Sequence, residues 1–172
     1  MIASINQIRQ LYQPKKIQIL FITEAVQPGN VFFYRKNSNV FRAVKEAFTI
    51  VFGSFKDHDD FLMFFKENGC YVDYLCLEQI NGLAATVRQK MRSNGVKPLS
   101  ERLALMQPKV IITVMKVLDR EVSEAVKLSA ITCVEYTKAI AFPAHSKTNA
   151  DKCVKELVTI LNELLKTNIW LD

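Results

Sequence analysis

The sequence is poor in several residue types, and each shortage excludes a class of protein. Of its 172 residues only five are glycine, five are proline and four are cysteine. Because no two cysteines form a CxxC pair, their spacing matches neither a zinc site nor an iron–sulfur site, and they are too few for a disulfide scaffold. No run approaches the roughly 18 consecutive apolar residues of a membrane-spanning helix. We therefore expect no metal, no cofactor and no membrane contact.

What is present indicates one ordinary globular domain. Apolar residues make up 49% and charged residues 23% of the chain. A chain of this length buries roughly 70% of its extended surface, which is enough for one core, and no flexible tract divides it, so we predict a single domain over residues 1–172. The first residues lack a charged segment followed by an apolar one, so we expect no secretory signal. The cysteines then indicate the reduced core of a cytoplasmic protein, with an interior disulfide as the alternative.

Short apolar runs alternate with amphipathic stretches along the chain. The runs predict four strands within residues 17–22, 71–77, 110–115 and 131–142. Apolar residues at helical spacing predict helices at 39–52, 60–67, 83–92, 100–106, 118–128 and 148–166. Gly53 is expected to end the first helix, Ser100 to cap the fourth, Thr148 to begin a capping box for the last, and Trp170 to anchor the tail. Strands alternating with helices predict the α/β class, as a three-layer α/β/α sandwich with a central four-stranded, mostly parallel sheet.

In such sheets ligands bind beyond the carboxyl ends of the strands, which directs attention to residues 23–34, 78–83 and 143–149. The first segment contains Pro28-Gly29 and three adjacent aromatic residues, of which Phe33 and Tyr34 are the second and third. We expect at least one of the three to face a cleft, where its ring can stack on a planar ligand. The alternative is that two lie in the core and the third plugs the surface.

The other two segments offer polar side chains. The amide of Asn81 has both a donor and an acceptor for a base edge, although Asn-Gly is also an ordinary turn. Ser146, Lys147 and Thr148 precede the last helix, where free N–H groups attract phosphate; the alternative is a plain cap with a solvated lysine. His145 is one of only two histidines and lies in this same loop.

Positive charge is concentrated in one part of the chain. Residues 84–116 contain seven lysines and arginines against one glutamate, so their net charge of +6 equals that of the whole chain. A basic face of this kind favours nucleic acid through counterion release. A solvated helix face is the alternative.

In order and content, the three segments resemble the motifs of the uracil-DNA glycosylase superfamily. A first motif of that family, GEAPG, is similar to Thr23-Glu24-Ala25-Val26-Gln27-Pro28-Gly29, and the spacing of Tyr34, Asn39 and Phe41 is similar to that of the mismatch-specific branch. Phe142-Pro143-Ala144-His145-Ser146 resembles the last motif, HPSP or MPSSS. The resemblance implies a three-layer α/β fold, DNA as the partner, and hydrolysis of the N-glycosidic bond of a flipped, uracil-like base.

The resemblance also implies roles for individual residues. Phe33 or Tyr34 would stack on the flipped base, and Asn81 is the nearest match to the asparagine that follows the second strand. Glu24 would hold the water or stabilise the sugar cation, with capping of its own loop as the alternative, and His145 would donate to a base oxygen. The sequence departs from the family at Ala25, which replaces the catalytic Asp or Asn, and at His145, which is displaced by three residues. A catalytically silent nucleic-acid or nucleotide binding protein on the same fold is therefore the alternative function.

Overall fold

The structure, a computed structural model, describes residues 2–170, with side chains from residue 5 onward. One sheet contains the strands β1 (Ile19–Ala25), β2 (Cys70–Cys76), β3 (Val110–Val114) and β4 (Tyr136–Ile140), in the order β2-β1-β3-β4. All three strand pairs are parallel. Ile19 lies opposite both Cys70 and Val110, which sets the register of β2, β1 and β3.

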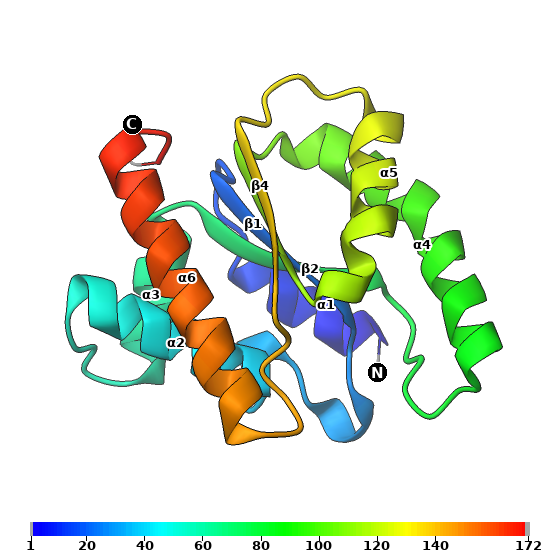
Figure 1. The fold of residues 1–172 in the computed structure, drawn as a ribbon, viewed down its shortest axis with the longest axis horizontal. Helices are drawn as coiled ribbons and strands as arrows, with labels where there is room; N and C mark the ends of the chain where they lie inside the picture. The colour runs from blue at the N-terminus through cyan, green and yellow to red at the C-terminus, as the bar shows by residue number, and fades with distance from the viewer. Residues whose placement is uncertain (1, 171–172) are drawn as a thin grey trace.

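Helices cover both faces of this sheet (Figure 1). They are α1 (Ile2–Leu11), α2 (Asn39–Phe52), α3 (His58–Glu67), α4 (Ala85–Met106), α5 (Asp119–Ser129) and α6 (Lys147–Thr167). In the view of Figure 1, α2, α3 and α6 lie to the left of the sheet and α4 and α5 to the right. The α/β class and the three layers predicted from the sequence are thereby confirmed.

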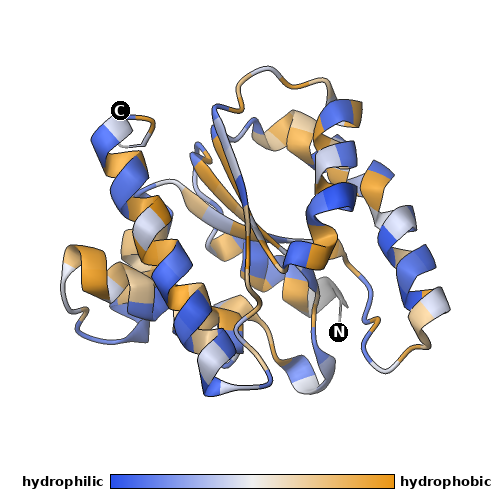
Figure 2. Ribbon diagram, viewed as in Figure 1, coloured by the Kyte–Doolittle hydropathy of each residue, from blue (hydrophilic) through white to orange (hydrophobic). Residues whose placement is uncertain are grey.

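The core is centred on β1, β2 and β3, whose residues are all buried. Figure 2 shows these strands as mainly hydrophobic, whereas β4 at the sheet edge is more polar, with Thr137 and Lys138 exposed. Phenylalanines of α2 and α3 pack on the face of the sheet that these helices cover. Phe65 of α3, for example, packs on Phe21 of β1 with ring centroids 5.4 Å apart. Trp170 is buried and donates from Nε1 to the Asn68 carbonyl at 2.8 Å, so it anchors the tail as predicted.

Local signals predicted α2 and its ends correctly. Ser38 adopts an extended conformation, and its Oγ accepts a hydrogen bond from the Phe41 N–H at 3.0 Å, which satisfies one of the free donors of the first turn. Gly53 follows with a φ of 98°, a conformation that a side chain would disfavour, and the helix ends there.

Three predictions about helices were wrong. The helices expected at 83–92 and 100–106 are one helix, α4, which continues through Pro98; Ser100 caps nothing and donates to the Lys97 carbonyl within the helix. The last helix begins at Lys147, and its cap is Ser146 rather than Thr148. The sequence pattern also missed α1, because its short apolar stripe gains stability only by packing on the folded sheet.

All four cysteines are free, so the expected reduced cysteines are confirmed and the alternative of an interior disulfide is wrong. Cys70, Cys76 and Cys153 are buried, and Cys133 is half-buried. Within residues 2–170, no helix combines the length and the apolar character needed to cross a bilayer.

Candidate functional site

The carboxyl ends of the four parallel strands form one rim of the sheet, which we call the carboxyl rim. The loops that follow β1, β2 and β4 lie along this rim, at the lower edge of Figure 1. The three segments singled out in the sequence therefore reach the same edge of the molecule. Whether their side chains form a common site depends on where each one points.

The three adjacent aromatic residues do not line an open cleft. Phe32, Phe33 and Tyr34 have exposed fractions of 1%, 1% and 2%. The Tyr34 ring is stacked on Tyr12, the residue after α1, and packs on Tyr71 of β2, with ring centroids 5.2 and 5.8 Å away. Tyr34 therefore has no free ring face for a base, and of the three aromatic residues only Phe32 and Phe33 border a cavity.

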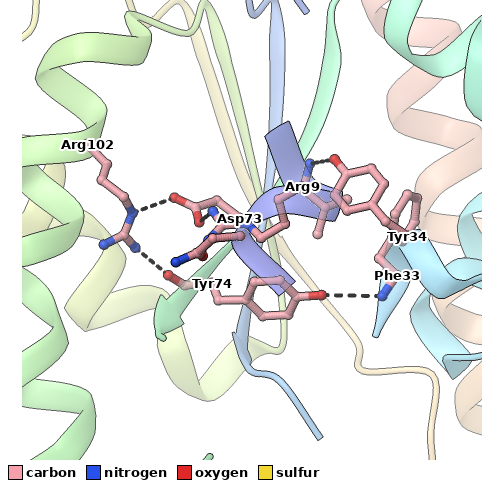
Figure 3. Close-up of polar contacts among 8 residues, drawn as sticks. Arg9, Phe33, Tyr34, Asp73, Tyr74 and Arg102 are labelled. Carbon is pink, nitrogen blue, oxygen red and sulfur yellow. Dashed lines mark hydrogen bonds and ion pairs between the residues drawn. The ribbon is translucent and has the colours of Figure 1, made fainter. Parts of the chain in front are cut away.

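Tyr34 instead covers the open edge of β2. Its hydroxyl accepts a hydrogen bond of 2.8 Å from the backbone N–H of Val72 (Figure 3). Since β2 pairs only with β1, this N–H has no strand partner on its other side, and an unpaired buried donor is costly. Protection of this strand edge thus explains why Tyr34 is buried.

Phe33 does contribute to a small cavity at the carboxyl rim, which we call the rim cavity. Its volume is about 20 Å³, and it lies at the ends of β1 and β2. The lining residues are Thr23, Ala25, Gln27, Val31, Phe32, Phe33, Ser38, Val40, Tyr74 and Phe142. Because Phe142 lies in the loop after β4, directly before the third predicted segment, the cavity brings the loops after β1 and β4 together. A volume of this size holds about one water molecule.

Two polar side chains of the rim cavity lack hydrogen bonds to the residues that the structure describes. One is the hydroxyl of Thr23, a residue that is 6% exposed, and the other is the half-buried amide of Gln27. In contrast, the Ser38 hydroxyl caps α2, and the Phe33 N–H donates to the Tyr74 hydroxyl at 3.3 Å. The lining includes neither a carboxylate nor an imidazole.

Glu24 points to the opposite face of the sheet and does not line the rim cavity. Its Oε1 accepts hydrogen bonds from Arg88 Nε at 2.9 Å and Arg92 Nε at 2.6 Å, and a terminal nitrogen of each arginine also contacts the carboxylate. Burial favours a higher pKa for Glu24, but the hydrogen bonds and charges of the two arginines outweigh it and hold the pKa below its ordinary value. The carboxylate is therefore held by two arginines of α4, and among the described residues it accepts no hydrogen bond from the backbone of its own loop.

The remaining predicted site residues lie in the loops after β2 and β4 and in the first turn of α6. Ser146 caps α6 through its hydroxyl, Lys147 pairs with Asp151 at 3.3 Å, and Thr148 is exposed, which matches the plain-cap alternative. His145 is exposed and Asn81 is half-buried, and neither has a hydrogen bond to another described residue. A phosphate contact at residues 146–148 and a base contact at Asn81 or His145 stay predictions.

The basic stretch is not simply a charged surface. Arg88 and Arg92 turn inward to Glu24, and Arg102 turns inward to Asp73. Three of the seven cations predicted to face nucleic acid are therefore paired between α4 and the sheet, and a fourth, Lys116, lies 3.6 Å from Glu156. The fully buried residues of α4 are Gly95, Leu99, Ser100 and Leu103, and the three partly buried arginines lie beside them.

An ion network centred on Asp73 was missed by sequence reasoning (Figure 3). The carboxylate is fully buried in β2 and pairs with Arg9 of α1 and Arg102 of α4. Arg102 also donates to the carbonyl of Tyr74. A single aspartate within an otherwise apolar strand was the available signal, because a buried charge requires a partner.

A larger cavity, of about 390 Å³, opens between the end of β2 and α4. It is lined mainly by apolar side chains such as Leu75 and Met91, together with Glu78, Asn94 and Arg102. Among the residues described, no group of three or more histidine, cysteine, aspartate or glutamate side chains is placed to hold a metal ion.

No protein-family model matches this sequence, and no curated protein matches it significantly.

Proposed function

We propose that this protein is a uracil-DNA glycosylase-like protein that binds DNA at the carboxyl rim and recognises a uracil-like base in the rim cavity without hydrolysing it. The resemblance of the loop motifs supports the family, and the three-layer fold is the one that this resemblance implies. The excess of positive charge over the whole chain supports a nucleic-acid partner.

The rim cavity is the observation that carries this proposal. Its walls include the aromatic rings of Phe32, Phe33 and Phe142, and the polar groups of Thr23 and Gln27 have no protein partner among the described residues. A flipped pyrimidine is held by stacking on rings and by hydrogen bonds to its edge, which is what this combination offers. With room for about one water, the cavity must widen to admit a base. Val31 and Phe142 are half-buried apolar residues of the wall, and that widening would depend on them.

Recognition is favoured over hydrolysis by the position of Glu24. Cleavage of the glycosidic bond requires a group that positions water or stabilises the developing sugar cation. The cavity lining contains no carboxylate or imidazole, and Glu24 is bound by two arginines on the other face of the sheet. Hydrolysis would require a rearrangement of this ion pair.

The test combines binding and cleavage on the same oligonucleotides. Fluorescence anisotropy compares single- and double-stranded DNA carrying one uracil with matched thymine DNA, and alkali treatment then reveals abasic sites. We expect tighter binding to uracil and no alkali-labile product. T23V, which keeps the size of the side chain but removes its hydroxyl, should abolish the preference for uracil. T137V on exposed β4 is the matched control and should leave the preference unchanged.

Two results would contradict the proposal, one its silent form and the other its DNA binding. Strand cleavage after alkali would establish an active glycosylase and reject the silent form of the proposal. Failure of the wild-type protein to bind any of these oligonucleotides would reject the DNA-binding function itself.

A further inference from the structure

Two arginines of α4 share one carboxylate at the end of β1. Arg88 and Arg92 each place Nε and a terminal nitrogen against Glu24. The cluster therefore contains two positive charges and one negative charge. Side-chain exposure is 6% for Glu24, 12% for Arg92 and 32% for Arg88, so the positive excess reaches the surface through Arg88.

The arginines keep unused donors on their outer edges. A guanidinium group has five N–H donors, and Glu24 occupies only those on one edge of each group. Within residues 2–170, the second terminal nitrogen of Arg88 and that of Arg92 have no acceptor. Two fixed guanidinium groups with free outer edges match the paired oxygens of a phosphate group.

The position of the cluster places it beside the proposed DNA-binding face. Glu24 lies near the carboxyl end of β1, and Arg88 and Arg92 lie in the first turns of α4, which follows the loop after β2. The cluster therefore lies at the carboxyl rim, on the face of the sheet opposite the rim cavity. A nucleic-acid backbone that follows the rim would pass both features.

We infer that Arg88 and Arg92 form a phosphate-binding site, in which Glu24 orients the two guanidinium groups and limits their net charge. Glu24 thus acts as a positioning residue in place of the catalytic role that the family resemblance implied for it. The proposed function makes the DNA backbone the expected source of the phosphate; a free nucleotide is the other source, and the experiment separates the two.

The first measurement uses inorganic phosphate and does not depend on DNA. Nuclear magnetic resonance follows the Nε–H signals of the arginines during titration. We expect the signals of Arg88 and Arg92 to shift saturably, whereas Arg120, which pairs with Glu121 and is 72% exposed, serves as the internal reference and should not. R88A should weaken phosphate binding about tenfold, because a hydrogen-bonded charge is lost. K90A, which removes an exposed cation of the same helix, should leave it unchanged.

The variant E24Q distinguishes an effect on phosphate affinity from an effect on the stability of the fold. Both R88A and E24Q break the same ion pair and should lower the melting temperature. Their phosphate affinities should move in opposite directions, however, since E24Q raises the net charge of the cluster from +1 to +2. If R88A does not fold, R88K keeps the charge but loses the paired donor geometry, and it should also bind phosphate more weakly than the wild type.

The second measurement identifies the source of the phosphate. With an oligonucleotide, R88A should reduce the slope of log affinity against log salt by about one. If R88A weakens only the binding of deoxyuridine monophosphate, the source is a free nucleotide. Unshifted Arg88 and Arg92 signals, or equal phosphate affinity in the wild type, R88A and E24Q, would overturn the inference even if DNA binds. Failure to bind DNA would overturn the proposed function and leave a positive phosphate titration standing.

Discussion

The Asp73 carboxylate accepts a hydrogen bond of 2.8 Å from Arg102 Nε, which joins β2 to α4 inside the protein (Figure 3). Its other oxygen pairs with Arg9, so three elements distant in the sequence meet at one buried charge. Burial favours a lower pKa for Arg9, but Asp73 more than compensates, and the pKa is raised. This network holds α1 against the sheet, and α1 in turn supports the Tyr34 ring through Tyr12.

Loss of the Asp73 charge should destabilise the protein strongly. D73N leaves Arg9 and Arg102 without their anion in a buried setting, and we expect the free energy of unfolding to fall by about 3–5 kcal/mol. Urea denaturation followed by circular dichroism measures this change. D59N removes a carboxylate that pairs with Lys36 on the surface and should cost less than about 1 kcal/mol. Equal effects of the two variants would contradict the central role of Asp73.

The hydroxyl of Tyr34 should matter more than that of Tyr12. Y34F removes the acceptor of the Val72 N–H and leaves a buried donor unsatisfied, so we expect a loss of about 1–3 kcal/mol and faster amide exchange at Val72. Y12F keeps the stacked ring and removes a hydroxyl that has no hydrogen bond to the described residues. It should leave exchange at Val72 nearly unchanged. Unaltered exchange in Y34F would show that this N–H is satisfied in another way.

Alanine should destabilise α4 at position 95, although it favours helices elsewhere. A Cβ on Gly95 would lie 2.5 Å from the Leu75 carbonyl oxygen, so α4 would have to move away from β2. This strain should outweigh the gain of about 1 kcal/mol in helix propensity. The exposed neighbour Ser93 provides the control, because S93A should be neutral or slightly stabilising in the same thermal denaturation. A rise in melting temperature for G95A would show that the helix moves without penalty.

Glu24 should contribute to acid sensitivity. Its pKa is lower in the folded state than in the unfolded chain, so its stabilising contribution is present above the unfolded pKa of about 4.3 and is lost as the pH falls through the folded value. The free energy of unfolding should therefore decline less steeply below pH ~5 in E24Q than in the wild type. E78Q, which removes an exposed carboxyl at the same rim, is the matched control. Parallel slopes in E24Q and the wild type would contradict the lowered pKa.

The cysteines should differ in their reactivity toward iodoacetamide. Burial raises the pKa of Cys76 to about 11 and that of Cys153 to about 12, and it also raises the pKa of Cys70. Cys133 is half-buried, so it should be alkylated first in the native protein, as mass spectrometry of peptides would show. In denaturant all four should react alike. Early modification of Cys70 or Cys153 would indicate an opening of the core.

The sequence alone was sufficient for the features that depend on near neighbours. The strands, the limits of α2 and the stop at Gly53 follow from apolar periodicity and turn chemistry, which act over a few residues. Parallel topology then placed the three loops at one rim before any side chain was located. The continuous helix through Pro98 was not predicted, because contacts between α4 and distant β2 override a residue that locally breaks helices.

Only the tertiary structure decided which way the polar and aromatic side chains point. Glu24 turns to two arginines more than sixty residues away, and Tyr34 turns to the edge of β2 instead of to a ligand. A sequence pattern shows that a charge or a ring will be buried or paired, but it cannot choose the partner, because that choice depends on which distant segments meet in space.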